Sequence, residues 1–117
     1  MTIVRHIPGP RMSQAVLAGG FVFLSGQIPD DRTADIAGQT SETLGKIDKL
    51  LAELGMSKSD LVSLQVWLSD IRDFSGMNEA WEVWVDQANP PARATAGVDL
   101  ASQGVKVEII AVAFDDS

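Results

Sequence analysis

A single arginine stands out in the C-terminal third of the sequence. Arg93 lies in the stretch NPPARATAGVDL, residues 89–100, which is otherwise mostly short, small or apolar. A planar guanidinium binds a carboxylate through two parallel hydrogen bonds, so Arg93 is a candidate clamp for a small carboxylate. A surface arginine paired with one of the 16 acidic residues is the alternative that this pattern leaves open.

Glu108 is the second candidate, because it interrupts the apolar segment VKVEIIAVAF, residues 105–114. A carboxylate among apolar residues is unfavourable unless it is paired or reaches a wet cavity. A carboxylate in such a cavity suits general acid–base chemistry. A glutamate on an edge strand that points to water would give the same pattern.

Three further positions could complete a site. The segment LSGQIP places Ser25 and Gly26 at the end of an apolar run, where a strand end can turn backbone N–H groups and a hydroxyl toward a ligand. An ordinary turn fits the same residues. Asn78 is a polar residue near Trp81 in a helical pattern, where it could brace a loop or face solvent.

The composition indicates a single domain spanning residues 1–117, because a chain of this length with 45% hydrophobic residues can bury one core. The net charge of −7 and the pI near 4.4 disfavour nucleic acid and anionic membranes as partners, since both need a basic surface. There is no cysteine, and the one histidine, His6, forms no metal site alone. No apolar run approaches the roughly 20 residues of a membrane helix. We therefore expect a cytoplasmic domain without a metal.

The N-terminal half of the pattern predicts three strands and a helix. A short strand is expected at residues 2–6, and two more should flank Gly19-Gly20, a pair that favours a tight hairpin turn. Leucine and isoleucine then recur at spacings of three and four, which predicts a helix from Ile36 to Leu54. Asp35 is its expected N-cap and Gly55 its expected stop.

The C-terminal half predicts a strand, a helix and two strands. The segment DLVSLQVWLSD predicts a buried strand, and a second helix is expected from about Ile71 to Gln87, where Asn89-Pro90-Pro91 should end it. The last two strands are expected at 92–98 and 105–114. This order predicts an α+β fold in which two helices cover one face of a mixed sheet.

The last strand is apolar on both sides, which predicts a second partner for the sheet. One set of alternating positions comprises Val105, Val107, Ile109, Ala111 and Ala113, and the other comprises Ile110, Val112 and Phe114. A strand that is apolar on both faces is buried on both. Because two helices cover only one face, we expect the other to pack on a second copy of the chain in a homo-oligomer.

Six segments in order resemble the RidA/YjgF family of reactive-imine deaminases over almost the whole length. They are Gly9-Pro10, LSGQIP, DIAGQTSETLGKIDKLLAELG with Gln39, DFSGMNEAWEVW with Asn78, PPARATAGVDL and VKVEIIAVA. The resemblance implies a chorismate-mutase-like subunit in a homotrimer. Its sheets would form a central barrel-like core, with three sites in clefts between neighbouring subunits.

The resemblance also implies a reaction, the hydrolysis of 2-imino acids or their enamine tautomers, such as 2-aminoacrylate, to 2-oxo acids and ammonia. It implies that Arg93 holds the substrate carboxylate and that Glu108 positions water and shuttles a proton to the imine nitrogen. Groups near Ser25, Gly26 and Thr95 would orient the substrate, and no cofactor would be needed. The alternative is a non-catalytic trimer that binds small carboxylates in the same clefts. An RNA-directed nuclease, also attached to parts of the family, is disfavoured by the charge of −7.

Three positions depart from the family pattern. Arg11 replaces the aromatic residue that often follows the early Gly-Pro, and a second cation there could favour a more acidic substrate or simply point to solvent. Ala94 follows Arg93 in place of serine or threonine, and Thr95 comes next, where some members have cysteine. Ile110 replaces the second glutamate of the closing strand, a change that bears on packing.

Overall fold

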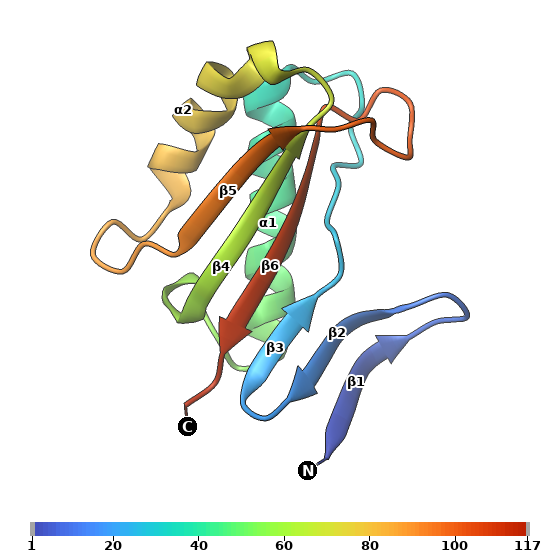
Figure 1. The fold of residues 1–117 in the computed structure, drawn as a ribbon, viewed down its shortest axis with the longest axis vertical. Helices are drawn as coiled ribbons and strands as arrows, with labels where there is room; N and C mark the ends of the chain where they lie inside the picture. Colours follow the sequence, from blue (N-terminus) through green and yellow to red (C-terminus); the bar gives the residue numbers. More distant parts are fainter. Residues whose placement is uncertain (1, 117) are drawn as a thin grey trace.

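The computed structural model describes residues 2–116. Within these residues the fold comprises one six-stranded sheet and two α-helices, and both helices pack on the same face of the sheet (Figure 1). The strands are β1 (Ile3–Pro8), β2 (Ser13–Ala18), β3 (Phe21–Leu24), β4 (Leu61–Leu68), β5 (Ala92–Gly97) and β6 (Val107–Phe114). The helices are α1 (Ile36–Glu53) and α2 (Phe74–Trp84). The predicted order of elements and the α+β class are confirmed.

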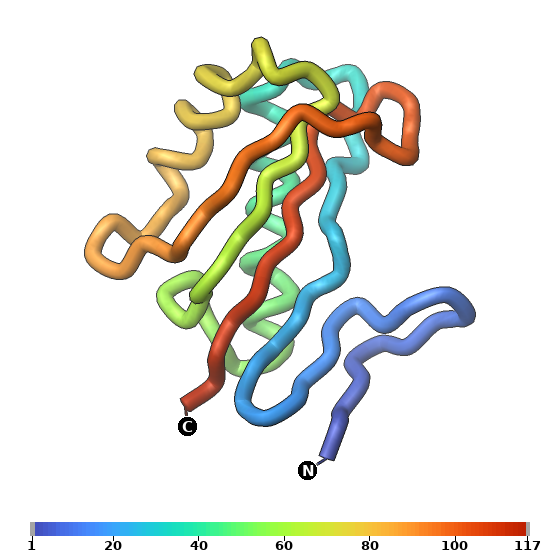
Figure 2. Tube along the Cα trace, viewed as in Figure 1, coloured from blue at the N-terminus to red at the C-terminus, as the bar shows by residue number. Residues whose placement is uncertain are grey.

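The strand order is β1-β2-β3-β6-β4-β5. Only β4 and β5 run parallel; every other pair of neighbours is antiparallel. The C-terminal strand β6 therefore lies in the middle of the sheet, between β3 and β4. Both chain ends lie at the same end of the molecule (Figure 2).

The predicted turn and cap residues have the expected geometry. Gly19 and Gly20 join β2 to β3 with φ values of 60° and 86°, as a two-residue hairpin turn with two left-handed positions requires. The Asp35 side chain accepts a hydrogen bond from the Gly38 N–H at 2.8 Å and so caps α1. Gly55, at φ 73°, follows the end of α1, where the Met56 N–H returns to the Leu51 carbonyl.

The predicted end of the second helix is wrong. A 3-10 turn at Ile71–Asp73 precedes α2, and α2 ends at Trp84 with Val85 already extended. The Asp86 carboxylate accepts a hydrogen bond from the Ala88 N–H at 3.1 Å, which gives the backbone a local turn in place of further helix. Asn89-Pro90-Pro91 thus lie beyond a turn, and they do not end the helix.

The two faces of the sheet differ in what covers them. The covered face packs against α1 and α2, and the layer between sheet and helices holds the largest fully buried apolar side chains: Val22, Leu44, Ile47, Leu51, Leu64, Val66, Leu68, Met77, Val107 and Ile109. The open face carries the alternate residues of the same strands, including Phe21 and Phe23 on β3 and Phe114 on β6. These three aromatic residues are 38–47% exposed.

Candidate functional site

Arg93 lies on the covered side of edge strand β5, against helix α2. Its register partner on β4 is Leu64, whose side chain belongs to the core. The guanidinium carbon lies 5.0 Å from the Trp81 ring centroid and 5.9 Å from the Phe74 ring centroid, and Nη1 lies 4.0 Å from the Met77 sulfur. All three neighbours come from α2, so helix and strand together hold the cation against apolar walls.

The electrostatic setting of Arg93 differs from that of a surface ion pair. Desolvation lowers the pKa of its guanidinium, and the charge of Glu82 acts in the opposite direction. Among residues 2–116, no carboxylate lies within 4.0 Å of the guanidinium, and no oxygen atom accepts a hydrogen bond from it. Its donor groups therefore remain available for an anion.

Thr95 and Asn78 come from the two elements that hold Arg93, β5 and α2. Thr95 is two residues further along β5 and so faces the same side. Its hydroxyl is buried and has no hydrogen-bond partner within the described residues. Asn78 lies one helical turn after Phe74 on α2 and is half-buried, so it projects from the same side of that helix. We use the name arginine pocket for this group of side chains: Arg93, Thr95, Asn78 and the α2 residues Phe74, Met77 and Trp81 that contact the guanidinium.

Glu108 lies on the open face, where its register partner is Trp67 of β4. It lines a cavity of about 200 Å³ together with Met12, Gly26, Ile28, Leu100, Ala101, Ser102 and Val105. A Cβ atom at Gly26 would lie 2.1 Å from the Glu108 Oε2 atom, so only glycine lets the carboxylate approach this backbone. We call this cavity the glutamate cleft.

Hydrogen bonds hold the backbone of the glutamate cleft in place. The Ser25 hydroxyl donates to Gln14 at 3.3 Å and accepts from the Gln27 side chain at 3.1 Å. Gln27 exchanges two backbone hydrogen bonds with Ile109, at 2.9 and 3.0 Å. The Ser25 side chain is thus engaged within the chain, and the Gly26 N–H next to it has no partner among residues 2–116.

Arg11 lies in the connection between β1 and β2 and is exposed. It lines a cavity of about 410 Å³ with Gly9, Pro10, Met12 and Gln14. Met12 also lines the glutamate cleft, so Arg11 lies beside that cleft.

One chain does not bring all the predicted residues together. Arg93 faces the covered side of β5, whereas Glu108 faces the open side of β6, and β4 lies between the two strands. Thr95 and Asn78 lie with Arg93, and Ser25, Gly26 and Arg11 lie with or near Glu108. Within one chain the predicted site residues therefore form two separate groups on opposite faces of the sheet, which we call the two half-sites of the predicted site.

The aromatic walls of the arginine pocket had no role in the sequence-based site. The helical spacing of Phe74, Met77 and Trp81 predicts a shared apolar face, but only the packing of α2 on β5 shows that Arg93 stacks there. Gln14 and Gln27 were missed as well, because their contacts with Ser25 depend on how β2 and the segment after β3 meet.

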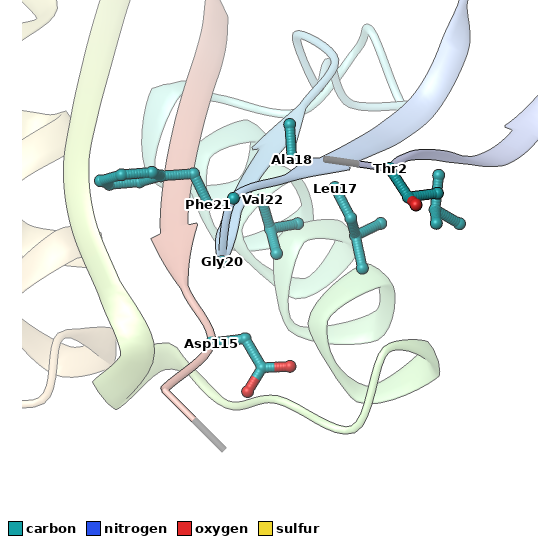
Figure 3. Close-up of a pocket in the computed structure, with 9 residues that line it drawn as sticks. Thr2, Leu17, Ala18, Gly20, Phe21, Val22 and Asp115 are labelled. Atoms are coloured by element: carbon teal, nitrogen blue, oxygen red, sulfur yellow. The ribbon is translucent and has the colours of Figure 1, made fainter.

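A third cavity lies apart from both half-sites. It occupies about 260 Å³ around the β2–β3 turn, and its lining includes Thr2, Leu17, Gly20, Phe21 and Asp115 (Figure 3). None of the predicted site residues contributes to it. Over residues 2–116, no three histidine, aspartate or glutamate side chains gather in a metal-binding group, and no helix in this range could span a membrane.

Comparison with known proteins places these features in a family. The chain matches the family model described as Endoribonuclease L-PSP over residues 5–114. It is 41% identical over 114 residues to a RutC family protein of Haemophilus influenzae. This match covers 97% of this chain and 98% of that protein. The RutC family protein YoaB of Escherichia coli is 37% identical over 113 residues, with 97% and 98% covered. A crystal structure of a YjgF-family protein from Neisseria meningitidis has a TM-score of 0.95 at 37% identity, covering 100% of this chain and 98% of that one.

A mixed six-stranded sheet with two helices on one face defines the chorismate-mutase-like class of α+β folds. The chain belongs to the YjgF/YER057c/UK114 family, which also carries the names RutC and L-PSP. The resemblance predicted from the six sequence segments is confirmed. The family model is named for an endoribonuclease and the relatives carry only a family name, so these names do not establish the reaction of this chain.

Proposed function

We propose that the protein is a hydrolytic deaminase of reactive 2-imino and enamine acids, working in the cytoplasm. The observation that carries the proposal is the arginine pocket. There, a partly desolvated guanidinium stacks on Trp81 and has no protein oxygen as a partner within residues 2–116. A cation held in this way is ready to bind an external carboxylate through charge-assisted hydrogen bonds.

The complete site in this proposal lies between two copies of the chain. One copy supplies the arginine pocket and its neighbour supplies the glutamate cleft, since a single chain keeps them on opposite faces of its sheet. The apolar open face, with Phe21, Phe23 and Phe114 partly exposed, supports packing against further copies. We propose a homotrimer with three such sites.

The chemistry follows from what each half-site holds. Arg93 binds the 2-carboxylate, and the Gly26 N–H and the Thr95 hydroxyl provide hydrogen-bonding groups that are unused within residues 2–116. Glu108 orients a water molecule toward the imine carbon and passes a proton to the imine nitrogen. The water oxygen bonds to carbon, the C–N bond breaks, and the products are a 2-oxo acid and ammonia. The overall reaction is a hydrolysis without net oxidation or reduction, so it needs no redox cofactor.

The rival is a trimer that binds small carboxylates without turnover. Such a protein needs the arginine pocket to bind the carboxylate of its ligand. It does not need the Glu108 carboxylate to lie against the backbone of Gly26. The fit of Glu108 against Gly26 therefore favours the enzyme. The endoribonuclease named by the family model is disfavoured here, because a chain of net charge −7 repels a polyanion.

The test generates an imino acid with an amino-acid oxidase and follows the trapping of that imine by semicarbazide with and without the protein. We expect acceleration of hydrolysis by the wild type and a loss of roughly 100- to 1000-fold in Arg93→Gln. Glu108→Gln should bind substrate but slow turnover by about 100-fold or more. Lys49→Gln, an exposed change on α1 of equal charge effect, is the matched control for Arg93→Gln. Wild-type protein that accelerates no imino acid would exclude the enzyme.

Mixing the two inactive variants tests whether a site spans two chains. In a randomly mixed trimer, about a quarter of the sites combine an intact Arg93 with an intact Glu108 from the neighbour. Refolding Arg93→Gln together with Glu108→Gln should therefore restore about a quarter of the activity. No restoration in a mixture that forms mixed oligomers would place both residues in one chain.

A further inference from the structure

Arg11 is a second cation beside the proposed site, and it lies in a neutral setting. It is exposed, and the residues that line its cavity, Gly9, Pro10, Met12 and Gln14, carry no charge. Within the described part of the chain, no acidic side chain pairs with it. In a chain with 16 acidic residues, a guanidinium left unpaired in this way is available to an outside anion.

Two contacts link Arg11 to the glutamate cleft. Met12, the next residue, lines both cavities, so the two cavities are adjacent. Gln14 lines the Arg11 cavity and accepts the hydrogen bond of the Ser25 hydroxyl, one residue before Gly26. An anion at Arg11 would therefore lie next to the part of the cleft that Glu108 serves.

The backbone around Arg11 is held in a defined shape. The Gly9 N–H donates to the Met12 carbonyl at 2.8 Å, which closes a tight turn around Pro10 and Arg11. Just before the turn, Ile7 has φ 50°, a left-handed conformation that β-branched residues rarely adopt. The β1–β2 pairing joins His6 to Ala15 and Pro8 to Ser13 and omits Ile7. Strain of this kind persists where the surrounding structure holds it, and it is often found next to binding sites.

We propose that Arg11 is a specificity residue that binds a second carboxylate, so that the protein prefers imines derived from acidic amino acids. This inference rests on the proposed deaminase function. In it, Arg93 binds the carboxylate next to the imine carbon, Glu108 serves the imine nitrogen, and Arg11 binds the carboxylate at the far end of the substrate. Arg11 takes no part in proton transfer, so its effect falls on substrate preference.

The experiment compares two imines made by amino-acid oxidases, one from glutamate and one from leucine. For each, kcat/KM is measured by semicarbazide trapping with wild type, Arg11→Gln, Arg11→Lys and the control Lys49→Gln. We expect wild type to favour the glutamate imine by roughly two- to fivefold, the usual scale of one exposed charge pair. Arg11→Gln should bring the ratio close to one by losing activity only on the glutamate imine. Arg11→Lys should keep part of the preference, and Lys49→Gln should keep all of it.

A second variant tests the role of the turn. Ile7→Gly removes the strain at φ 50° and frees the backbone before Arg11. It should lower the preference for the glutamate imine while the leucine imine is hydrolysed as before.

The outcomes separate this inference from the proposed function. If wild type hydrolyses both imines and Arg11→Gln keeps the wild-type ratio, Arg11 is not a specificity residue but the deaminase stands. Equal loss on both imines in Arg11→Gln would also overturn the inference, because Arg11 would then serve every substrate. If wild type accelerates neither imine, the deaminase function itself fails.

Discussion

The two faces of strand β6 are both apolar, but they differ in how completely the chain buries them. Val107, Ile109, Ala111 and Ala113 point to the covered face, where α1 and α2 leave each of them at most 1% exposed. Their neighbours Ile110 and Val112 are only half-buried, and Phe114 is 38% exposed on the open face. Both sets are apolar, so the sequence predicts that both faces of β6 are buried. The helices of the same chain bury only the covered face.

The two half-sites follow the same division. Arg93 lies where the covered layer ends, at the edge strand and against the walls of α2. Glu108 lies on the open face, where β6 meets the backbone of Gly26. Each charged group lies at a place where the chain's own residues no longer cover that face of the sheet. The following predictions test this contrast between covered and open faces, beginning with the largest effect.

Truncation of neighbouring isoleucines on β6 should give unequal losses of stability. Ile109→Ala removes a side chain that is fully buried on the covered face, and it should lower the free energy of unfolding by about 2–5 kcal/mol. Ile110→Ala on the open face should lower it by less in dilute protein, and its effect should grow with protein concentration as assembly contributes. Urea unfolding at several protein concentrations measures both. Equal losses, independent of concentration, would mean that the open face is not an interface.

A charge on the open face should separate the subunits without unfolding them. Phe23 is 47% exposed on β3, so Phe23→Glu is compatible with a folded chain. Burying its carboxylate between copies without a partner should cost several kcal/mol. We expect a folded monomer by analytical ultracentrifugation and circular dichroism, with little deaminase activity. An assembly of unchanged mass would show that Phe23 lies outside the interface.

Crowding the glutamate cleft should affect activity more than stability. Gly26→Ala places a methyl group 2.1 Å from the Glu108 Oε2 atom, which forces the carboxylate to move. We expect kcat to fall by about tenfold or more because proton transfer depends on position. Gly45→Ala is the control: its methyl group meets nothing within 4 Å in α1, and it should stabilise the protein by about 1 kcal/mol. Full activity in Gly26→Ala would mean that the position of Glu108 is unimportant.

Removal of the unpaired hydroxyl should separate binding from folding in the arginine pocket. Thr95→Val keeps the shape of a side chain whose buried hydroxyl has no partner within residues 2–116. The melting temperature should therefore stay equal or rise slightly, since no hydrogen bond inside the described chain is lost. The KM for imino acids should rise severalfold if the hydroxyl contacts substrate. A lower melting temperature with unchanged KM would give Thr95 a structural role.

The smallest effect concerns Arg72, which pairs with a carboxylate of the protein, whereas Arg93 has no such partner within residues 2–116. Arg72 hydrogen bonds to Asp70 at 2.7 and 3.1 Å and lowers the pKa of that carboxyl from 3.8 to about 2. Because the folded-state pKa is lowered, this stabilisation is present above pH 3.8 and is lost as the pH falls toward about 2. In Arg72→Ala, the free energy of unfolding should depend less on pH in this window. Unchanged pH dependence in acid titrations followed by circular dichroism would contradict this role for Arg72.

Local patterns in the sequence determined most of the elements and one face of the fold. Leu44, Ile47 and Leu51 recur at helical spacing, Asp35 supplies a cap oxygen, and Gly19-Gly20 supplies two left-handed positions. These signals act between residues close in the chain, so they can be read without the fold. The alternation of β6 likewise put Glu108 on the same side of the strand as Ile110 and Val112, although both sides are apolar in sequence. Arg93 and Glu108 could thus be chosen as candidates from residue type and context.

Only the tertiary structure decided how the candidates are divided. In ARATAG of β5, small residues fill both sets of alternating positions, so no contrast in hydrophobicity tells which face Arg93 takes. Its face is fixed by pairing with β4 and by packing on α2, and the place of β6 between β3 and β4 depends on contacts across the whole chain. The fit of Glu108 over Gly26 is equally outside a local pattern, because the two residues are far apart in the sequence. Residue types and periodicities can be read from short segments of the sequence. Strand order, and the face of the sheet on which a residue lies, depend on pairing between segments that are distant in the sequence.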